Sequence, residues 1–316
     1  MQIKGLVQSL RPKQWSKNLI IFAGLIFSAN FLHFDKVLIS FAAFVIFCFL
    51  SGGVYLLNDI LDVEKDRMHP IKSSRPIASG ALKISHAAIL AGILIAGSLA
   101  ASYLLQGSFF SQVEQNLDLG PVHGQLLQPS FFLVALSYVA LMTLYTFALK
   151  NVVVLDVMTI AIGFVLRAVA GAVVISVPLS SWLLICTVFL SLFLALCKRR
   201  HEIALLDENA SDHRKTLSEY DAYLLDQMIA IVSAACIMAY ALYTVSEETV
   251  AKFHTQSLLF TVVFVVYGMF RYLYLVHKKD IGGDPTMALL TDVPILANVC
   301  LWGLICLIII YIKRGV

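Results

Sequence analysis

The stretch Leu38 to Leu57, LISFAAFVIFCFLSGGVYLL, runs directly into the polar stretch Asn58 to Asp66, NDILDVEKD. The first stretch carries no charged residue. At about 1.5 Å per residue it would rise roughly 30 Å as a helix, which is the hydrocarbon thickness of a bilayer. It therefore predicts a transmembrane helix, and the second stretch places a group of acids at the end of that helix.

Oxygen-bearing side chains recur at helical spacing across this boundary. If the helix continues past Leu57, Asn58, Asp62 and Asp66 follow at intervals of four residues and lie about 40° apart on one slowly turning face. Asp59 lies beside that face. Clustered oxygens suit a hard cation such as Mg²⁺, which keeps several waters and takes further ligands from a substrate phosphate. We therefore expect Mg²⁺ ligands at four positions: Asn58, Asp59, Asp62 and Asp66.

Basic residues follow these acids within one short loop, at Arg67, His69, Lys72 and Arg75. Acids that hold a metal, followed by bases that bind phosphate oxygens, are what a diphosphate-binding site needs. The alternative is that the acids mark a solvated helix end without a function. Three acids and an asparagine, with four bases directly after them, favour the binding site.

The composition predicts an all-α polytopic membrane protein. Hydrophobic residues make up 59% of the 316 residues, charged residues only 14%, and the mean hydropathy is +0.85. A soluble domain carries roughly a quarter charged residues. We expect one transmembrane domain over residues 1–316, with nine helices around a central cavity that opens to the cytoplasmic side. The predicted spans lie near residues 16–33, 38–58, 85–105, 130–149, 152–176, 181–197, 225–245, 257–277 and 293–312.

The distribution of positive charge orients these spans. Most of the 23 lysine and arginine residues fall in the amino-terminal segment and in every second loop after it. Loops rich in lysine and arginine stay in the cytoplasm. We therefore expect a multi-pass protein of the cytoplasmic (inner) membrane, with the amino terminus and the acidic motif on the cytoplasmic side.

Two arginines, Arg167 and Arg271, fall within apolar spans, where a charge at the midplane costs at least ~2.5 kcal/mol. Arg167 follows Asp156 by three helical turns, so the two would share a face about 16 Å apart. This spacing predicts a polar stripe that lines a cavity. The alternative is that each arginine pairs with a carboxylate for a structural reason only.

The acidic motif resembles the first aspartate-rich motif of the UbiA superfamily of intramembrane prenyltransferases, through Asn58-Asp59-x-x-Asp62-x-x-x-Asp66, Arg75-Pro76 and Ser79-Gly80. The resemblance implies nine spans, a cytoplasmic amino terminus, and Mg²⁺ that activates a diphosphate leaving group. Members that use aromatic acceptors carry a second aspartate-rich motif between the sixth and seventh spans. This chain departs from that pattern, because the place is occupied by Lys198-Arg199-Arg200-His201-Glu202 and then by Arg214-Lys215.

Other segments are similar to the branch that contains the decaprenyl-phosphate phosphoribosyltransferases. They are Leu10 to Asn18, Tyr145 to Lys150, Val154 to Val157 and Gly163 to Gly171. The branch implies transfer of a 5-phosphoribosyl group from phosphoribosyl diphosphate (PRPP) to a polyprenyl phosphate, with release of diphosphate. A donor with a diphosphate and a separate phosphate needs more cationic partners than a prenyl diphosphate does, which agrees with the basic loop.

The resemblance and this chemistry together assign the site residues. Catalytic roles are expected for Asp59, Asp62, Asp66, Lys150 and Asp156. Substrate-binding roles are expected for Lys17, Asn58, Arg67, Lys72, Arg75, Tyr145, Arg167, Lys198, Arg199 and Arg200. Among these, Lys17 would meet the lipid phosphate, and Lys198 to Arg200 would hold the ribosyl phosphate.

Two other functions stay open at this point. A prenyltransferase that joins a prenyl diphosphate to an aromatic or other small acceptor would share the fold and the metal motif, and the absent second aspartate-rich motif argues against it. A transporter would use its intramembrane charges to gate solutes, and it predicts an internal repeat and broken helices. The polyprenyl length and the oligomeric state are not readable from the sequence. No nucleic-acid partner is expected.

Overall fold

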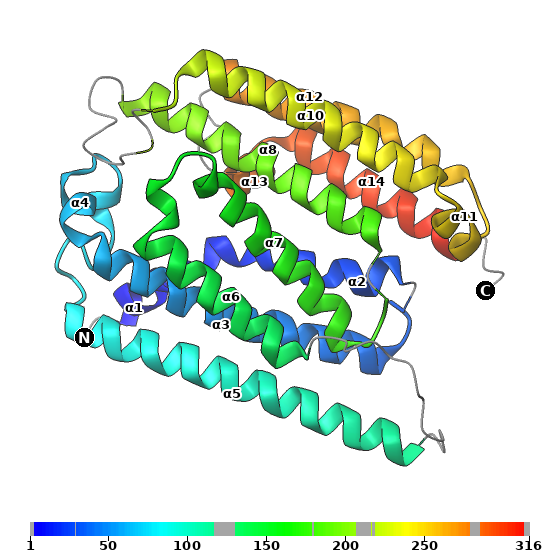
Figure 1. Ribbon diagram of the computed structural model, residues 1–316, viewed down its shortest axis with the longest axis horizontal. Coiled ribbons are helices and arrows are strands. Elements are labelled where there is room, and N and C mark those ends of the chain that lie inside the picture. The colour runs from blue at the N-terminus through cyan, green and yellow to red at the C-terminus, as the bar shows by residue number, and fades with distance from the viewer. Residues whose placement is uncertain are drawn as a thin grey trace. The chain divides into compact units, whose positions relative to one another are not determined.

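The computed structural model describes residues 3–28, 30–116, 130–178, 180–206, 216, 219–278 and 285–312, and in these residues every regular element is a helix (Figure 1). The chain divides into two units. The first comprises Met1–Leu149 and Leu166–Pro178, and the second comprises Lys150–Val165 and Leu179–Val316. The predicted central cavity stays a prediction.

Seven helical segments in the described part of the chain are long and apolar enough to cross a membrane. The helices that contain them are α3 (Phe34–Leu61), α5 (Ile84–Asn116), α7 (Leu155–Val174), α8 (Ser181–Leu206), α10 (Ala222–Val245), η6 with α12 (Ser257–Thr261 and Val262–Lys278) and α14 (Val293–Ile312). The backbone amides and carbonyls of a lipid-embedded segment must be satisfied within the segment, which is why each apolar run becomes a helix. The prediction of an all-α multi-pass membrane protein is confirmed, and the count of nine spans is not.

The two remaining predicted spans give shorter elements. The span predicted at 130–149 becomes α6, Phe131–Phe147, which has 17 residues. The span predicted at 16–33 becomes the 3₁₀ helix η1, Pro12–Ile21, followed by α2, Phe22–Phe27. A 3₁₀ helix rises about 2.0 Å per residue, so η1 and α2 together rise roughly 29 Å although they contain few residues.

The remaining short elements precede the long helices or lie between them. They are α1 (Ile3–Ser9), α4 (Val63–Met68), η2 (Lys72–Ser74), η3 (Leu149–Asn151), α11 (Glu247–Phe253) and α13 (Pro285–Thr291).

In the first unit, α3 lies against α5, α6, η1 and α2. The packing is close where glycines meet backbone. A Cβ added at Gly171 of α7 would lie 1.9 Å from the carbonyl oxygen of Ile21, and one added at Gly24 would lie 3.0 Å from the backbone of Ala172. Glycine therefore lets the end of α7 approach η1 and α2 more closely than any other residue would allow.

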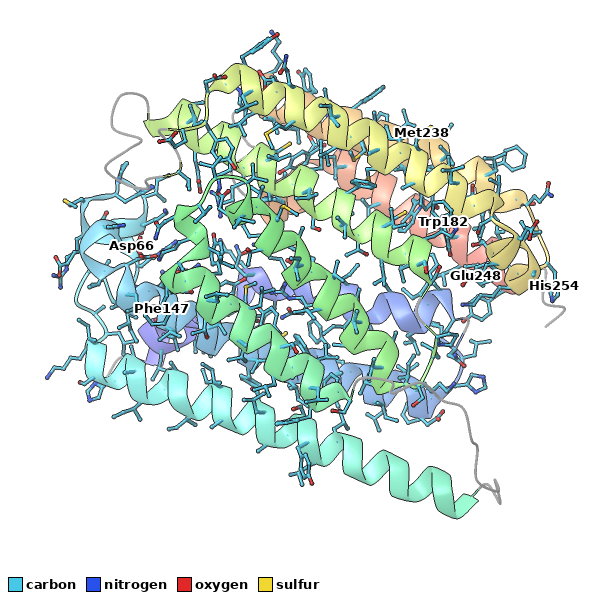
Figure 2. All side chains as sticks on the ribbon, viewed as in Figure 1. Asp66, Phe147, Trp182, Met238, Glu248 and His254 are labelled. Atoms are coloured by element: carbon cyan, nitrogen blue, oxygen red, sulfur yellow. The ribbon has the colours of Figure 1, made fainter. Side chains whose placement is uncertain are left out.

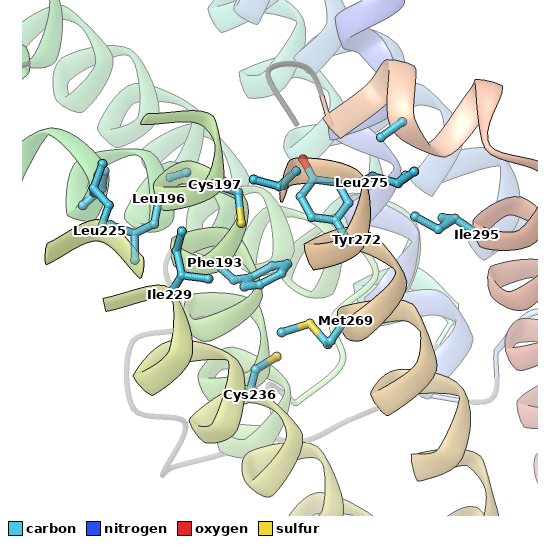
Figure 3. Close-up of a cluster of buried hydrophobic side chains, with 14 of the residues drawn as sticks. Phe193, Leu196, Cys197, Leu225, Ile229, Cys236, Met269, Tyr272, Leu275 and Ile295 are labelled. Atoms are coloured by element: carbon cyan, nitrogen blue, oxygen red, sulfur yellow. The ribbon is translucent and has the colours of Figure 1, made fainter. Parts of the chain in front are cut away.

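In the second unit, α8 packs along α10, and α12 packs against α14. Figure 3 shows the core of this unit, a cluster of buried apolar side chains. Most of them come from these four helices, and Val157 of α7, Tyr220 and Ala288 add to the cluster. Phe193 of α8 and Tyr272 of α12 lie at its centre, with ring centroids 5.6 Å apart. This core holds the end of α8, where the basic segment Lys198 to Arg200 lies.

The sequence prediction assumed that one unbroken helix carries the acidic motif. In the structure this helix is interrupted at Asp62. α3 ends at Leu61 and α4 begins at Val63, and Asp62 between them has φ −98° and ψ 9°. The backbone still turns at helical spacing, since the Asp62 N–H donates to the Asn58 carbonyl at 3.0 Å and the Asp66 N–H donates to the Asp62 carbonyl at 2.8 Å. With 28 residues, α3 rises about 42 Å and is longer than the hydrocarbon layer.

Candidate active site

The acidic motif lies at the junction of α3 and α4 in the first unit. Figure 2 labels Asp66 on α4. Asp59 of α3 is 4% exposed and Asp66 of α4 is 5% exposed, although both are carboxylates. One guanidinium nitrogen joins them, because Nη1 of Arg75 donates to Oδ1 of Asp59 at 3.0 Å and to Oδ2 of Asp66 at 2.6 Å. A second guanidinium, that of Arg11, also pairs with Asp59. The two buried negative charges therefore converge on shared cationic groups.

Asn58 and Asp62 complete the predicted ligand set and are half-buried. Within the described ranges no three His, Cys, Asp or Glu side chains are gathered closely enough to hold a metal ion. The chemistry of the set nevertheless fits Mg²⁺. Every donor is an oxygen, and the two buried carboxylates of Asp59 and Asp66 already face the same positive charge.

The loop after α4 is held in place by His69, whose side chain is 5% exposed. Its Nδ1 accepts the backbone N–H groups of Ile71 at 3.1 Å and Lys72 at 3.3 Å. Because Nδ1 accepts both bonds, it carries no proton. An imidazole in this role fixes the turn that leads to Arg75.

Apolar contacts anchor the same loop. Val63 of α4 and two loop residues, Ile77 and Leu82, are buried in a cluster with Leu56 of α3 and Ala87 of α5. The loop is thus packed onto the two helices at both ends. Its basic side chains are held near the acids by this packing.

The electrostatics of Asp66 reflect these neighbours. Burial raises the pKa of Asp66 above its ordinary value, while the charge of Arg75 and its hydrogen bond oppose the rise. Lys72 also lowers the pKa of Asp66 through its charge. Lys72 and Arg75, both predicted to bind diphosphate, therefore lie where they act on the acidic cluster.

Arg67 behaves differently from Arg75. Its Nε donates to the carbonyl of Ala78 at 3.3 Å, and its Nη1 pairs with Glu64 at 2.8 Å. The Ala78 contact ties α4 to the following loop, and the Glu64 contact lies within α4. The predicted contact of Arg67 with diphosphate stays a prediction.

A second polar cluster in the first unit surrounds Arg167 of α7, which is 4% exposed. Its Nε donates to Oδ1 of Asn18 at 2.7 Å, and its Nη2 donates to the hydroxyl of Tyr138 at 2.7 Å. The guanidinium also lies over the Tyr138 ring, 4.7 Å from its centroid. The amide of Asn18 in turn donates to Ser51. Neighbouring elements therefore supply these partners for a charge in an apolar span.

A third cluster, in the second unit, surrounds Asp156 at the start of α7, which is fully buried. Nε of Arg199 donates to its Oδ2 at 2.9 Å, and the hydroxyl of Tyr220 donates to its Oδ1 at 2.9 Å. Arg199, 2% exposed, also pairs with Glu202, and Lys198 lies 4.0 Å from Glu202. Burial raises the pKa of Tyr220 to about 12, so its hydroxyl stays protonated at neutral pH.

The remaining predicted residues lie on separate elements. Lys17 is on η1, Tyr145 on α6 and Lys150 on η3, and all three are half-buried. Arg200 pairs with Asp226 of α10 at 3.0 Å. The roles predicted for these four residues stay predictions. Arg214 and Lys215 lie outside the described residues.

The other arginine in an apolar span, Arg271 of α12, pairs with a carboxylate, as the structural alternative predicts. Its Nε and Nη2 donate to the two carboxylate oxygens of Asp292, at 3.2 and 2.8 Å. The guanidinium also lies 5.0 Å from the centroid of the Tyr274 ring. This bidentate pair joins α12 to the start of α14.

The site residues expected from the sequence did not include four partners: Arg11, Tyr55, Tyr138 and Tyr220. Arg11 adopts φ 50° and stacks over Tyr55, 5.0 Å from its ring centroid, while it pairs with Asp59. Tyr138 and Tyr220 supply hydroxyls to Arg167 and Asp156, as described above. Arg11 precedes Pro12, and this dipeptide is the one local signal that marks a special backbone there.

Comparisons with known proteins place this chain in a family. A sequence model of the UbiA prenyltransferase family matches residues 18–291, a range that runs through both units. The chain is 34% identical over 250 residues to the decaprenyl-phosphate phosphoribosyltransferase of Mycolicibacterium smegmatis, covering 78% of this chain and 72% of the relative. It is 37% identical over 241 residues to the enzyme of the same name from Corynebacterium glutamicum, covering 76% of this chain and 67% of the relative.

Among solved structures, a UbiA homologue from Archaeoglobus fulgidus bound to GPP and Mg²⁺ has the same fold. The TM-score is 0.68 at 15% sequence identity, over 99% of this chain and 100% of the homologue. The family match covers most of the chain, and the structural likeness extends over nearly all of it. The chain therefore belongs to the UbiA prenyltransferase family.

Proposed function

We propose that this chain transfers the 5-phosphoribosyl group of PRPP to a polyprenyl phosphate and releases diphosphate. The observation that carries the proposal is its identity of 34% and 37% to two decaprenyl-phosphate phosphoribosyltransferases over about three quarters of the chain. Lys198 and Arg200 support it, because a donor with three phosphate groups needs many cationic partners.

The reaction is a substitution at the anomeric carbon of the ribose. An oxygen of the lipid phosphate forms the new bond to this carbon, and the bond from the carbon to the diphosphate oxygen breaks with its electron pair. The lipid phosphate is already anionic near neutral pH, so the attacking oxygen has no proton to lose. The protein therefore needs to position two anions and stabilise a departing third, and a strong general base is unnecessary.

Mg²⁺ would be held by Asp59, Asp62 and Asp66 with help from Asn58, and when bound it would neutralise charge on the departing diphosphate. Asp59 and Asp66 support this assignment, since both carboxylates are buried and face one cationic group. The A. fulgidus homologue was solved with GPP and Mg²⁺, which is a diphosphate and a metal in a protein of the same fold.

Arg75 and Lys72 would bind the diphosphate oxygens, with Arg67 beside them. Arg75 is suited to this role because it is 26% exposed on its side chain while its Nη1 touches both acids. Its guanidinium offers further N–H donors in a planar fork that matches phosphate oxygens.

The other predicted residues contact the rest of the two substrates in this proposal. Lys17 would bind the lipid phosphate, and Lys198 and Arg200 would bind the ribosyl phosphate. Tyr145, Lys150 and Arg167 would surround the sugar. Asp156 and Arg199 are left out of these contacts, because their side chains are buried against each other.

We also propose that nine segments cross the inner membrane and that the acidic cluster faces the cytoplasm. The support is the excess of lysine and arginine in the amino-terminal segment and in alternate loops. Soluble activated donors such as PRPP are made in the cytoplasm, so this orientation gives the acidic cluster access to them.

A direct assay tests the function. Purified protein in detergent, with Mg²⁺, radiolabelled PRPP and decaprenyl phosphate, should produce a labelled lipid and free diphosphate. A parallel reaction with geranyl diphosphate and a hydroxybenzoate tests the prenyltransferase alternative. A labelled prenyl product, with no label transferred from PRPP to the lipid, would overturn the proposal in favour of that alternative.

A further inference from the structure

Tyr220 lies just before α10, and its hydroxyl makes two hydrogen bonds inside the second unit. It donates to Oδ1 of Asp156 at 2.9 Å and accepts the backbone N–H of Val154 at 2.8 Å. A phenol has one proton to donate and lone pairs that accept, so one hydroxyl serves both partners. Tyr220 is 4% exposed and Asp156 is fully buried. Both bonds are therefore shielded from water.

Val154 adopts a backbone conformation that its side chain disfavours. Its φ is +67°, in the left-handed region, which a β-branched residue rarely enters. Such a conformation persists only where the surroundings hold it. The Tyr220 hydroxyl is bonded to the amide of this strained residue, and it is thus placed to hold it.

The same segment is tied down at a second point. The hydroxyl of Thr216, which is 1% exposed, donates to the carbonyl of Lys150 at 3.4 Å. Two residues that precede α10 therefore bind the backbone of the short segment from Lys150 to Val154. This segment carries the amine of Lys150 and leads directly into Asp156.

Asp156 and Arg199 complete the arrangement. Oδ2 of Asp156 accepts from Nε of Arg199 at 2.9 Å, and Arg199 also pairs with Glu202. These contacts join the start of α7 to the end of α8. The carboxylate of Asp156 therefore has a partner on each oxygen, Arg199 on one and Tyr220 on the other.

We propose that Tyr220 is a positioning residue, whose hydroxyl acts through the backbone of Val154 to hold residues 150–156 in the conformation that binds the phosphoribosyl donor. We call the hydrogen-bonded group of Tyr220, Val154, Asp156 and Arg199 the latch. Asp156 and Arg199 belong to it and do not touch the substrate. The inference rests on the proposed function, because it takes Lys150 as a residue that binds the donor.

Tyr220→Phe tests the latch, since it removes only the hydroxyl. Tyr223→Phe is the matched control, because Tyr223 lies three residues away and is 72% exposed. The KM for PRPP should rise about 10-fold in Tyr220→Phe, as expected for the loss of one buried hydrogen bond to a charged group. The KM for decaprenyl phosphate should not change, and Tyr223→Phe should match the wild type.

Tyr220→Phe that retains the wild-type KM for PRPP would overturn the proposal. A lower kcat with both KM values unchanged would also overturn it, because that pattern indicates only a smaller folded fraction.

A second substitution tests the route through Val154. Glycine takes a positive φ without steric cost. In a Tyr220→Phe background, Val154→Gly should therefore recover most of the affinity for PRPP. A double variant no better than Tyr220→Phe would refute a role that acts through this backbone.

Hydrogen–deuterium exchange tests the latch without any substrate. Tyr220→Phe should speed exchange of the amides in residues 150–158, and unchanged exchange would overturn the proposal. If the wild type transfers no phosphoribosyl group, the proposed function fails while this experiment still decides the latch. If Tyr220→Phe does not fold, Thr216→Val replaces it, because it removes the hydrogen bond to the Lys150 carbonyl and keeps the side-chain shape. Thr216→Val should speed exchange of the amides in residues 150–158. Unchanged exchange in this variant would likewise overturn the proposal.

Discussion

Nη1 of Arg75 lies 2.6 Å from Oδ2 of Asp66, and this contact joins the loop after α4 to the acidic motif. The same nitrogen lies 3.0 Å from Oδ1 of Asp59. Removing one partner of a buried ion pair leaves an uncompensated charge away from water, which costs more than the pair itself contributes. Arg75 therefore has a structural task in addition to the diphosphate contact that we propose.

Replacement of Arg75 should affect stability and activity together. Arg75→Gln should destabilise the protein by roughly 1–3 kcal/mol and lower transfer at least ~10-fold, because two buried carboxylates lose their shared cation. Arg75→Lys should fall between this variant and the wild type, since it keeps the charge without the planar fork. Thermal unfolding and PRPP kinetics measure both effects. Lys65→Gln, an exposed change on α4, is the control, and equal behaviour of Arg75→Gln and Lys65→Gln would contradict the prediction.

The metal assignment predicts a loss of turnover when either of two acids becomes an amide. Asp62→Asn and Asp66→Asn should each abolish Mg²⁺-dependent transfer, because an amide is a weaker ligand for a hard cation and carries no charge. Both variants should still insert into the membrane. Transfer measured across a Mg²⁺ titration tests this.

Glu64→Gln is the matched control for these two variants. Glu64 lies on the same helix, its side chain is 75% exposed, and it pairs only with Arg67 among the ion pairs described. It should respond to Mg²⁺ as the wild type does. Full activity in both Asp62→Asn and Asp66→Asn would refute the metal assignment.

Two replacements of His69 should differ in their effect on the KM for PRPP, because only one keeps the hydrogen-bond acceptor. The side-chain oxygen of asparagine lies at the same distance along the side chain as Nδ1 and also accepts hydrogen bonds, so His69→Asn should keep the turn that holds Lys72 and Arg75. His69→Leu leaves two backbone N–H groups without an acceptor and should raise the KM for PRPP about 10-fold. Steady-state kinetics of the two variants decide the point. Equal KM values would show that the turn does not depend on an acceptor at residue 69.

The long helices were predictable because a single segment in lipid can satisfy its backbone hydrogen bonds internally only as a helix. Uncharged runs such as Leu38 to Leu57 must satisfy their own hydrogen bonds. The irregular parts were less predictable. The spacing of apolar residues predicts neither the 3₁₀ conformation of η1 nor the break at Asp62. Both features depend on contacts with neighbouring elements, and residue spacing carries no information about those contacts.

The acidic motif and the nearby Arg75 were visible in the sequence, whereas partners from distant parts of the chain were not. Helical spacing placed Asn58, Asp62 and Asp66 on one face with Asp59 beside it. In the structure, Arg75 contacts both Asp59 and Asp66. Arg11 pairs with Asp59 from 48 positions away, and Arg167 bonds to Asn18 from 149 positions away. Contacts at such separations are set by how helices pack. Helical periodicity alone could predict a face for Arg167 but not the side chain that meets it there.

The close approach of η1 to α7 gives a stability prediction that is independent of function. Gly171→Ala would place a methyl group 1.9 Å from the carbonyl oxygen of Ile21. Backbone on both sides leaves no flexible side chain to move, so the helices must separate, at a cost of at least about 1–3 kcal/mol. A lower unfolding temperature in detergent measures this.

Gly97 of α5 provides the opposite case in the same first unit. A Cβ at Gly97 would meet no atom within 4 Å. Alanine favours a helix over glycine by about 1 kcal/mol. Gly97→Ala should therefore leave the unfolding temperature unchanged or raise it. If Gly171→Ala unfolds at the same temperature as Gly97→Ala, then α7 and η1 do not pack backbone to backbone at this point. Arg167 lies four residues before Gly171 on α7, so its placement beside Asn18 of η1 would lose its support as well.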